Sequence, residues 1–87
     1  MEKNNIIVEE RVQDRTIVFN PETGKMYEFN EIESTIWEHI EEEPCNIAQR
    51  IQESYDVSLE QVLVDIENFK LQLESAKLVK DADTIII

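Results

Sequence analysis

The chain has 87 residues, an apolar content of 41% and a formal net charge of −12. A chain of this length forms one small domain with a single core and no deep catalytic cleft, and its apolar content predicts folding rather than disorder. Residues 30–87 carry fourteen acidic and four basic side chains. That part of the chain would repel a phosphate backbone, so we expect no nucleic-acid binding.

The residue types also argue against catalysis and metal binding. Cys45 is the single cysteine and cannot form an internal disulfide, and no Cys/His cluster suggests a metal site. His39 is the single histidine and lies on the first predicted helix between Glu38 and Ile40, where a solvated or half-buried role is favoured over catalysis. The N-terminus lacks a signal-peptide pattern, and no apolar run approaches the ~20 residues that cross a membrane. We therefore expect a soluble cytoplasmic protein that is not an enzyme and uses no cofactor.

The first third of the chain predicts a three-stranded antiparallel sheet. Residues rich in β-branched and aromatic side chains indicate strands, here at 6–12, 15–19 and 25–29. The loop 20–24 contains Pro21 and the only glycine, a strong hairpin signal. In the third strand, side-chain alternation places Tyr27 and Phe29 on one face, with Met26 and Glu28 on the other.

The rest of the chain predicts three helices. The first begins at Asn30, whose side chain forms a capping box with Glu33, and ends at the acidic run 41–43. The second begins at Pro44, which suits a first helical position, and runs to about residue 55. The third is capped by Ser58 and runs to about residue 76. The fold class is therefore α+β and winged-helix-like: a three-stranded antiparallel sheet followed by three helices, in one domain (1–87) with a core at 6–79 and a tail at 80–87.

The third helix has two sets of apolar residues. Its predicted core stripe consists of Leu59, Val62, Ile66, Phe69 and Leu73. Leu63, Val64 and Leu71 lie off that stripe, either as scattered surface side chains or as the lining of a groove. The tail ends in three isoleucines and is open to three interpretations: a strand, a free end, or a segment that folds back into the groove.

The order of residues along the chain resembles a known family. The matching positions are residues 21–24, 29–30, 36–37, 47, 51, 55–57, 62, 65–66, 69, 73 and 78–79. Together they resemble the PqqD-like family, small recognition domains that bind the leader segments of ribosomally made precursor peptides, including the stand-alone leader-binding proteins of lasso-peptide pathways. The resemblance covers residues 6–79 and departs from the family pattern in two loops, at 42–44 and 76–77.

The resemblance implies a peptide-binding site. In that family the leader adds as an extra strand on the free edge of the third strand and is clamped by the third helix. The predicted site residues are Lys25, Met26, Tyr27, Glu28 and Phe29 on the strand, and Leu63, Val64, Glu67, Lys70 and Leu71 on the helix. The implied partners are the leader peptide and a maturation enzyme, which is either a radical SAM enzyme or a leader protease working with a cyclase.

Two other functions fit the composition. One is an acidic winged-helix module that contacts a protein or a transcription partner. The other is a structural subunit whose 25–29 strand pairs with its own copy in a dimer. If the protein binds a leader peptide, its many carboxylates favour a leader that carries Lys or Arg beside its apolar anchors.

Overall fold

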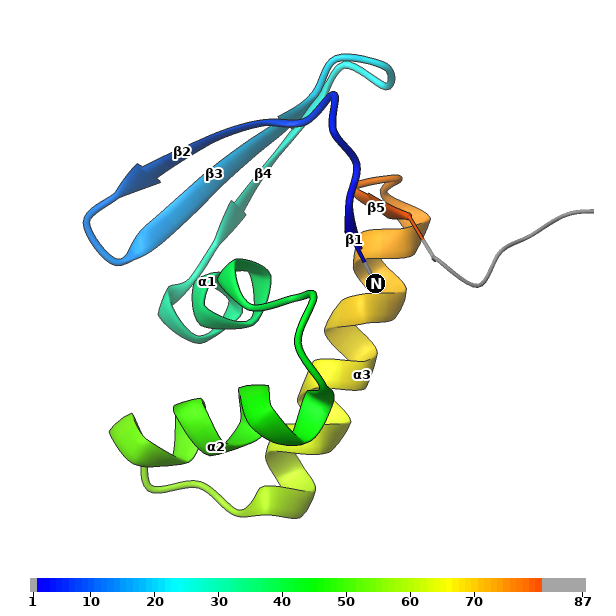
Figure 1. Cartoon of the computed structure of the whole chain (residues 1–87). Helices are drawn as coiled ribbons and strands as arrows, with labels where there is room; N and C mark the ends of the chain where they lie inside the picture. The colour runs from blue at the N-terminus through cyan, green and yellow to red at the C-terminus, as the bar shows by residue number, and fades with distance from the viewer. Residues whose placement is uncertain (1, 81–87) are drawn as a thin grey trace, which may run out of the picture.

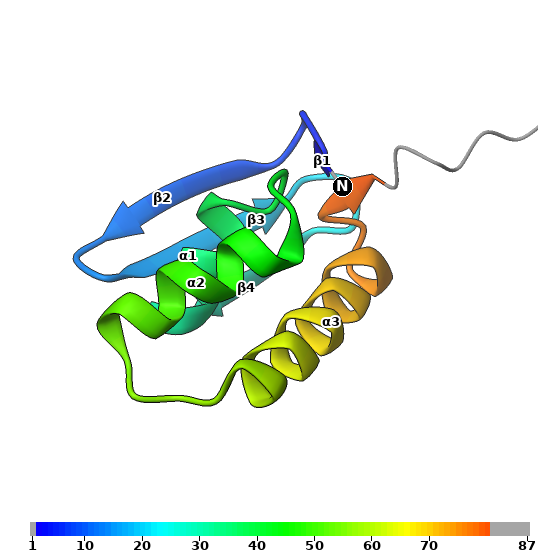
Figure 2. The same ribbon diagram turned by 60° about the horizontal axis from the view of Figure 1, so that its bottom comes forward.

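The computed structural model describes residues 2–80. These residues form five strands and three helices: β1 (Glu2–Lys3), β2 (Val8–Val12), β3 (Arg15–Asn20), β4 (Lys25–Phe29), α1 (Glu31–Glu38), α2 (Pro44–Ser54), α3 (Leu59–Ser75) and β5 (Val79–Lys80). Strands β2, β3 and β4 form an antiparallel sheet in that order. The helices gather on one side of this sheet (Figures 1 and 2). The predicted sheet and three helices are confirmed.

Local signals in the sequence set most of the element boundaries. Gly24 closes the β3–β4 hairpin with φ +74°, and its N–H donates to the Asn20 carbonyl at 2.8 Å. A side chain with a Cβ rarely adopts that φ, which explains the glycine. Asn30 and Glu33 form the predicted capping box, with side-chain to backbone distances of 2.8 and 2.9 Å. Pro44 begins α2, and Ser58 accepts a hydrogen bond from the Gln61 N–H.

Two helical predictions need correction. Helix α1 ends at Glu38, three residues before the acidic run. The α-helical hydrogen-bond pattern stops there, because the Ile40 N–H donates to the carbonyl of Trp37, only three residues earlier. That turn brings Ile40 into the core. Leu59 was assigned to the core stripe of α3 but is 45% exposed. It is the first residue of α3 and lies about 60° round the helix from buried Val62.

Three aromatic rings join the sheet to the helices. The Phe29 ring, at the end of β4, lies 5.5 Å from the Trp37 ring of α1 and 5.0 Å from the Phe69 ring of α3. The second pair meets edge to face, at 84°, an arrangement favoured by the ring quadrupoles. All three side chains are buried. Phe29 therefore links the end of β4 to both α1 and α3.

A second, two-stranded sheet was not predicted. β1 pairs antiparallel with β5, with Glu2 opposite Lys80 and Lys3 opposite Val79. The Asn4 N–H extends this contact by donating to the Leu78 carbonyl at 2.9 Å. The ladder brings the start of the chain beside the end of α3 (Figure 1). Residues 81–87, which include the three isoleucines of the predicted tail, lie outside the described residues.

Candidate functional site

The candidate site begins with the exposed edge of β4. This strand is last in the sheet order, and no strand within residues 2–80 pairs with its outer side. Figures 1 and 2 show α3 running alongside that side of β4. The edge of a sheet presents unpaired backbone N–H and C=O groups that another extended chain can complete. The β4 edge therefore offers backbone pairing next to a helix.

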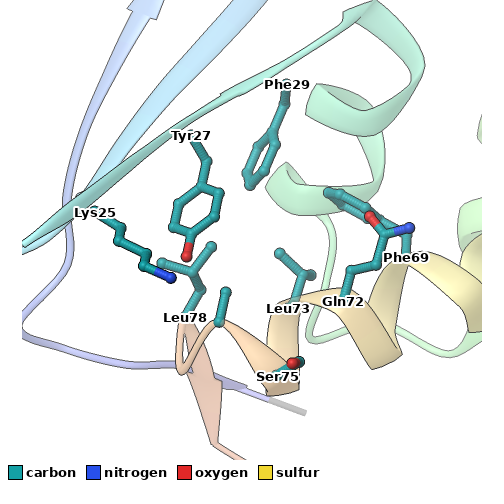
Figure 3. Close-up of a pocket in the computed structure, with 9 residues that line it drawn as sticks. Lys25, Tyr27, Phe29, Phe69, Gln72, Leu73, Ser75 and Leu78 are labelled. Atoms are coloured by element: carbon teal, nitrogen blue, oxygen red, sulfur yellow. The ribbon is translucent and has the colours of Figure 1, made fainter. Parts of the chain in front are cut away.

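A hollow of about 380 Å³ lies between β4 and α3. Figure 3 shows Tyr27 and Phe29 projecting from the strand toward Phe69, Gln72 and Leu73 of the helix. The hollow is lined by Lys25, Tyr27, Phe29, Phe69, Gln72, Leu73, Ser75, Ala76 and Leu78. Most of these side chains are apolar or aromatic, which suits a pocket that takes apolar anchors of a ligand.

A second hollow, of about 370 Å³, continues the first along α3. The two share Phe69 and Gln72, and we call them together the β4–α3 groove. The second hollow is lined by Asn30, Ile32, Glu33, Ile36, Asp65, Asn68, Phe69 and Gln72. Because α3 runs opposite to β4, residues early in the helix lie near the end of the strand, and residues late in the helix lie near its start.

Asn20 holds α3 against the β3–β4 hairpin. Its side chain is fully buried, and its amide nitrogen donates to the carbonyls of Ala76 and Lys77, both at 3.2 Å. Its amide oxygen accepts the Glu22 N–H at 2.9 Å. Carbonyls at the end of a helix have no partner within the helix, so Asn20 both satisfies them and fixes one end of the groove. The Phe29–Phe69 contact fixes the other.

The predicted strand residues divide between the two faces of β4. Lys25, Tyr27 and Phe29 line the groove together. Met26 and Glu28 have side chains on the opposite face, where Met26 is 67% exposed and Glu28 forms an ion pair with Arg15 at 3.2 Å. The backbone of all five residues still belongs to the edge strand. Their role in peptide binding remains a prediction.

The predicted residues of α3 lie outside the lining of the groove. Neither hollow is lined by Leu63, Val64, Glu67, Lys70 or Leu71. Val64 and Leu71 are 52% and 59% exposed. Each lies about 40° round the helix from a groove-lining residue four positions later, Asn68 for Val64 and Ser75 for Leu71, and therefore lies at the outer rim of the groove. Leu63 packs against the core cluster instead. Binding by these five residues also remains a prediction.

The groove side of α3 is formed largely by residues that had no predicted role in binding. Asp65, Asn68 and Gln72 line it with spacings of three and four, which place them on one flank of the core stripe. Phe69 and Leu73 were predicted as core residues and also close the groove floor. The sequence signal for this flank was a row of polar residues beside the apolar core stripe, but the same pattern occurs on any helix with a solvent-facing flank.

The other edge of the sheet, β2, is a less suitable site. Its five residues are all exposed, and three of them are charged: Glu9, Glu10 and Arg11. Charges on an edge strand discourage pairing with another chain. The small hollow beside β2 is occupied by charge contacts, including Lys3–Glu9 and Arg11–Glu38, both at 3.4 Å.

Two further features of the described residues concern membranes and metal ions. Among residues 2–80, no helix combines the length and apolar character needed to cross a bilayer. In the same part of the chain, no three His, Cys, Asp or Glu side chains gather in a way that could hold a metal ion.

The fold and groove define a small α+β domain whose edge strand adjoins a groove with an apolar section. Residues 15–79 match the family model described as coenzyme PQQ synthesis protein D (PqqD), so the chain belongs to the PqqD family. The fold is shared with the solved structure "TbiB1 in Complex with the TbiA(beta) Leader Peptide", with a TM-score of 0.85, 21% identity and 100% of both chains covered. No curated protein matches the chain. The predicted family and fold class are confirmed.

Proposed function

We propose that this protein binds the leader segment of a ribosomally made precursor peptide and presents it to a maturation enzyme. The leader adds as a strand to the edge of β4, and its side chains enter the β4–α3 groove. The observation that carries this proposal is the juxtaposition of an edge strand, unpaired within residues 2–80, with an apolar hollow of about 380 Å³. Backbone pairing supplies affinity in such sites, and pockets for alternate side chains supply specificity.

Family membership supports the same function. The PqqD family model covers the strands and helices that build the groove, from β3 to the start of β5. The solved neighbour with the same fold is a complex with a leader peptide. In this proposal the domain carries no chemistry of its own. The maturation enzyme is either a radical SAM enzyme or a leader protease working with a cyclase.

A binding measurement tests the proposal directly. A fluorescently labelled leader peptide, taken from the precursor encoded beside this protein, is titrated while its anisotropy is recorded, with a labelled DNA duplex as control. Saturable binding of the leader but not the duplex is expected. Amide chemical shifts should then change along β4 and the groove side of α3. Shifts confined to β2, or no binding even with the maturation enzyme added, would contradict the proposal.

Proline substitutions test strand addition at the level of the backbone. In an antiparallel ladder, successive residues direct their N–H and C=O groups to opposite sides. One of the variants Met26→Pro and Tyr27→Pro must therefore remove an outward donor, while the other breaks the ladder with β3. The variant that keeps its thermal unfolding transition should lose leader binding, and Met26→Ala and Tyr27→Ala control for the side chains. Full binding by that folded proline variant would exclude strand addition.

One observation favours a second candidate, a protein-interaction module. The sheet face opposite the helices carries Val8, Phe19 and Met26 in one cross-strand row, with Val8 and Met26 60% and 67% exposed. No described helix covers that face (Figure 2). Chemical shifts that change there, and not in the groove, when a partner protein is added would favour this function over leader binding.

A further inference from the structure

The β4–α3 groove has opposite charges at its two ends. Lys25 lies at the end formed by the start of β4 and the end of α3, beside Ser75 and Ala76. Glu33 and Asp65 lie at the other end, where α1 begins. The section between them is lined mainly by Tyr27, Phe29, Phe69 and Leu73. The ligand therefore meets a cation, then an apolar section, then two carboxylates.

These charges are available to a ligand. Within residues 2–80, Lys25 belongs to none of the five ion pairs, and neither do Glu33 and Asp65. Glu33 uses one carboxylate oxygen to accept the Asn30 N–H, and Asp65 uses one to accept from the Gln61 amide. A carboxylate has further acceptor sites on its two oxygens. A cationic side chain of a ligand can thus bind either acid without breaking its internal hydrogen bond.

The two walls of the groove set the length of peptide that spans it. The chain advances five residues from Lys25 to Asn30, about 17 Å in an extended conformation. On the other wall, α3 advances eleven residues from Asp65 to Ala76, also about 17 Å at helical rise. An extended peptide covers that distance in roughly four to six residue steps. An even number of steps keeps both end side chains on the groove face.

The direction of the added strand fixes the order of the charges in the peptide. Both ladders of the main sheet are antiparallel, and antiparallel pairing is somewhat more stable per residue than parallel pairing. A peptide antiparallel to β4 runs from the Phe29 end toward the Lys25 end. It therefore reaches Glu33 and Asp65 first and Lys25 last.

From this geometry we infer that the groove selects a peptide with a basic residue, then apolar residues, then an acidic residue, with the two charges four or six positions apart. This inference rests on the proposed function and specifies its ligand. Lys25, Glu33 and Asp65 are then specificity residues, and the apolar section provides the anchor. Contacts between exposed charges are individually weak, so each should change affinity by about two- to five-fold. The effect should decrease as salt screens the charges.

Three synthetic twelve-residue peptides test the order of charges. All share the same apolar residues, alternating with threonine. One carries Lys before and Asp after them, the second has the two exchanged, and the third has Gln and Asn in their place. The first should bind about five- to ten-fold more tightly than the second at low ionic strength. The difference should shrink at 0.5 M salt.

Exchanging the charges of the groove should reverse the preference. Lys25→Glu combined with Asp65→Lys keeps the net charge and should favour the second peptide. Arg11→Glu combined with Glu38→Arg exchanges the charges of an ion pair outside the groove and should leave the preference unchanged. Glu33→Gln keeps the capping box, because the glutamine side chain can also accept the Asn30 N–H. This variant should weaken the binding only of peptides that carry a basic residue.

The outcomes separate this inference from the proposed function. Equal binding of the first and second peptides, or tighter binding of the second, would overturn the charge order while leaving leader binding intact. If the three peptides fail to bind but the natural leader binds, the inference is also overturned. If the natural leader fails as well, the proposed function itself is wrong.

Discussion

Asn20 donates from its buried side-chain amide to the carbonyl of Ala76, 3.2 Å away and fifty-six residues later in the chain. The bond joins the end of β3, where the β3–β4 turn begins, to the C-cap residue of α3. Because these two segments lie at one end of the β4–α3 groove, the Asn20 amide helps to set the spacing of the groove walls there. This makes Asn20 a structural residue with a consequence for binding.

Replacing Asn20 should lower the free energy of unfolding more than replacing Asn4, which is less buried. Asn20→Ala leaves helix-end carbonyls without their buried donor, a cost of about 1–3 kcal/mol in the free energy of unfolding. Asn4 is only half-buried and donates to the same Lys77 carbonyl at 3.1 Å. Asn4→Ala should cost about 0.5–1 kcal/mol, since water can replace that donor. Urea unfolding of both variants measures the difference, and equal costs would contradict the role given to burial.

Tyr27 should contribute to leader affinity through its side chain, whereas Met26 should not. Tyr27 lines the groove (Figure 3). Met26, its neighbour in the same strand, has its side chain on the opposite face and is 67% exposed. Truncating a ring that meets the ligand typically costs more than about 1 kcal/mol of binding free energy. Tyr27→Ala should therefore weaken binding about tenfold and Met26→Ala less than about twofold. Anisotropy titrations would refute the assignment of faces if the two losses were alike.

A tryptophan placed in the groove should block the site without unfolding the protein. Gln72 is exposed and borders both hollows, so Gln72→Trp fills the space that the leader would occupy. Leu71→Trp places the same ring on the outer rim and serves as the control. Substitutions at exposed sites usually change stability by within about 0.5 kcal/mol. We expect binding to fall at least tenfold for Gln72→Trp only; the opposite result would place the ligand on the Val64–Leu71 rim.

The stability of the α1–α2 connection should depend on pH through Glu42. Partial burial tends to raise the pKa of this carboxyl, but hydrogen bonds and charge from Arg50, at 3.2 Å, and His39, at 2.8 Å, outweigh it and hold the pKa below its ordinary value. A carboxyl whose pKa is lower in the folded state than in the unfolded state stabilises the fold at pH values above its unfolded-state pKa. That stabilisation is lost as the pH falls through its folded-state pKa.

Glu42→Gln should therefore be less stable than the natural protein at pH 7, and the difference should close as the pH falls through the lowered pKa of Glu42. Urea unfolding at a series of pH values measures the gap. Glu41→Gln removes a neighbouring carboxylate that forms no ion pair within the described residues, and it should show a smaller gap. A gap that persists unchanged at pH 3 would show that the ion pairs do not cause it.

Local chemistry in the sequence was enough to predict the order and type of most elements. The hairpin at Gly24, the capping box of Asn30 and Glu33, and Pro44 at the start of α2 each depend on residues within a few positions of one another. The ordered pattern of residues also identified the family. The alternation of Tyr27 and Phe29 against Met26 and Glu28 correctly separated the two faces of β4.

Only the tertiary structure decided which flank of α3 faces β4. The rotation of that helix is set by distant contacts, Phe69 with Phe29 and Ala76 with Asn20, and these place Asp65 and Gln72 in the groove instead of Lys70 or Leu63. The β1–β5 ladder was missed for a related reason. Two-residue strands have no periodicity, and their pairing joins opposite ends of the chain. Local patterns fix what each segment forms, whereas long-range packing fixes which side chains meet.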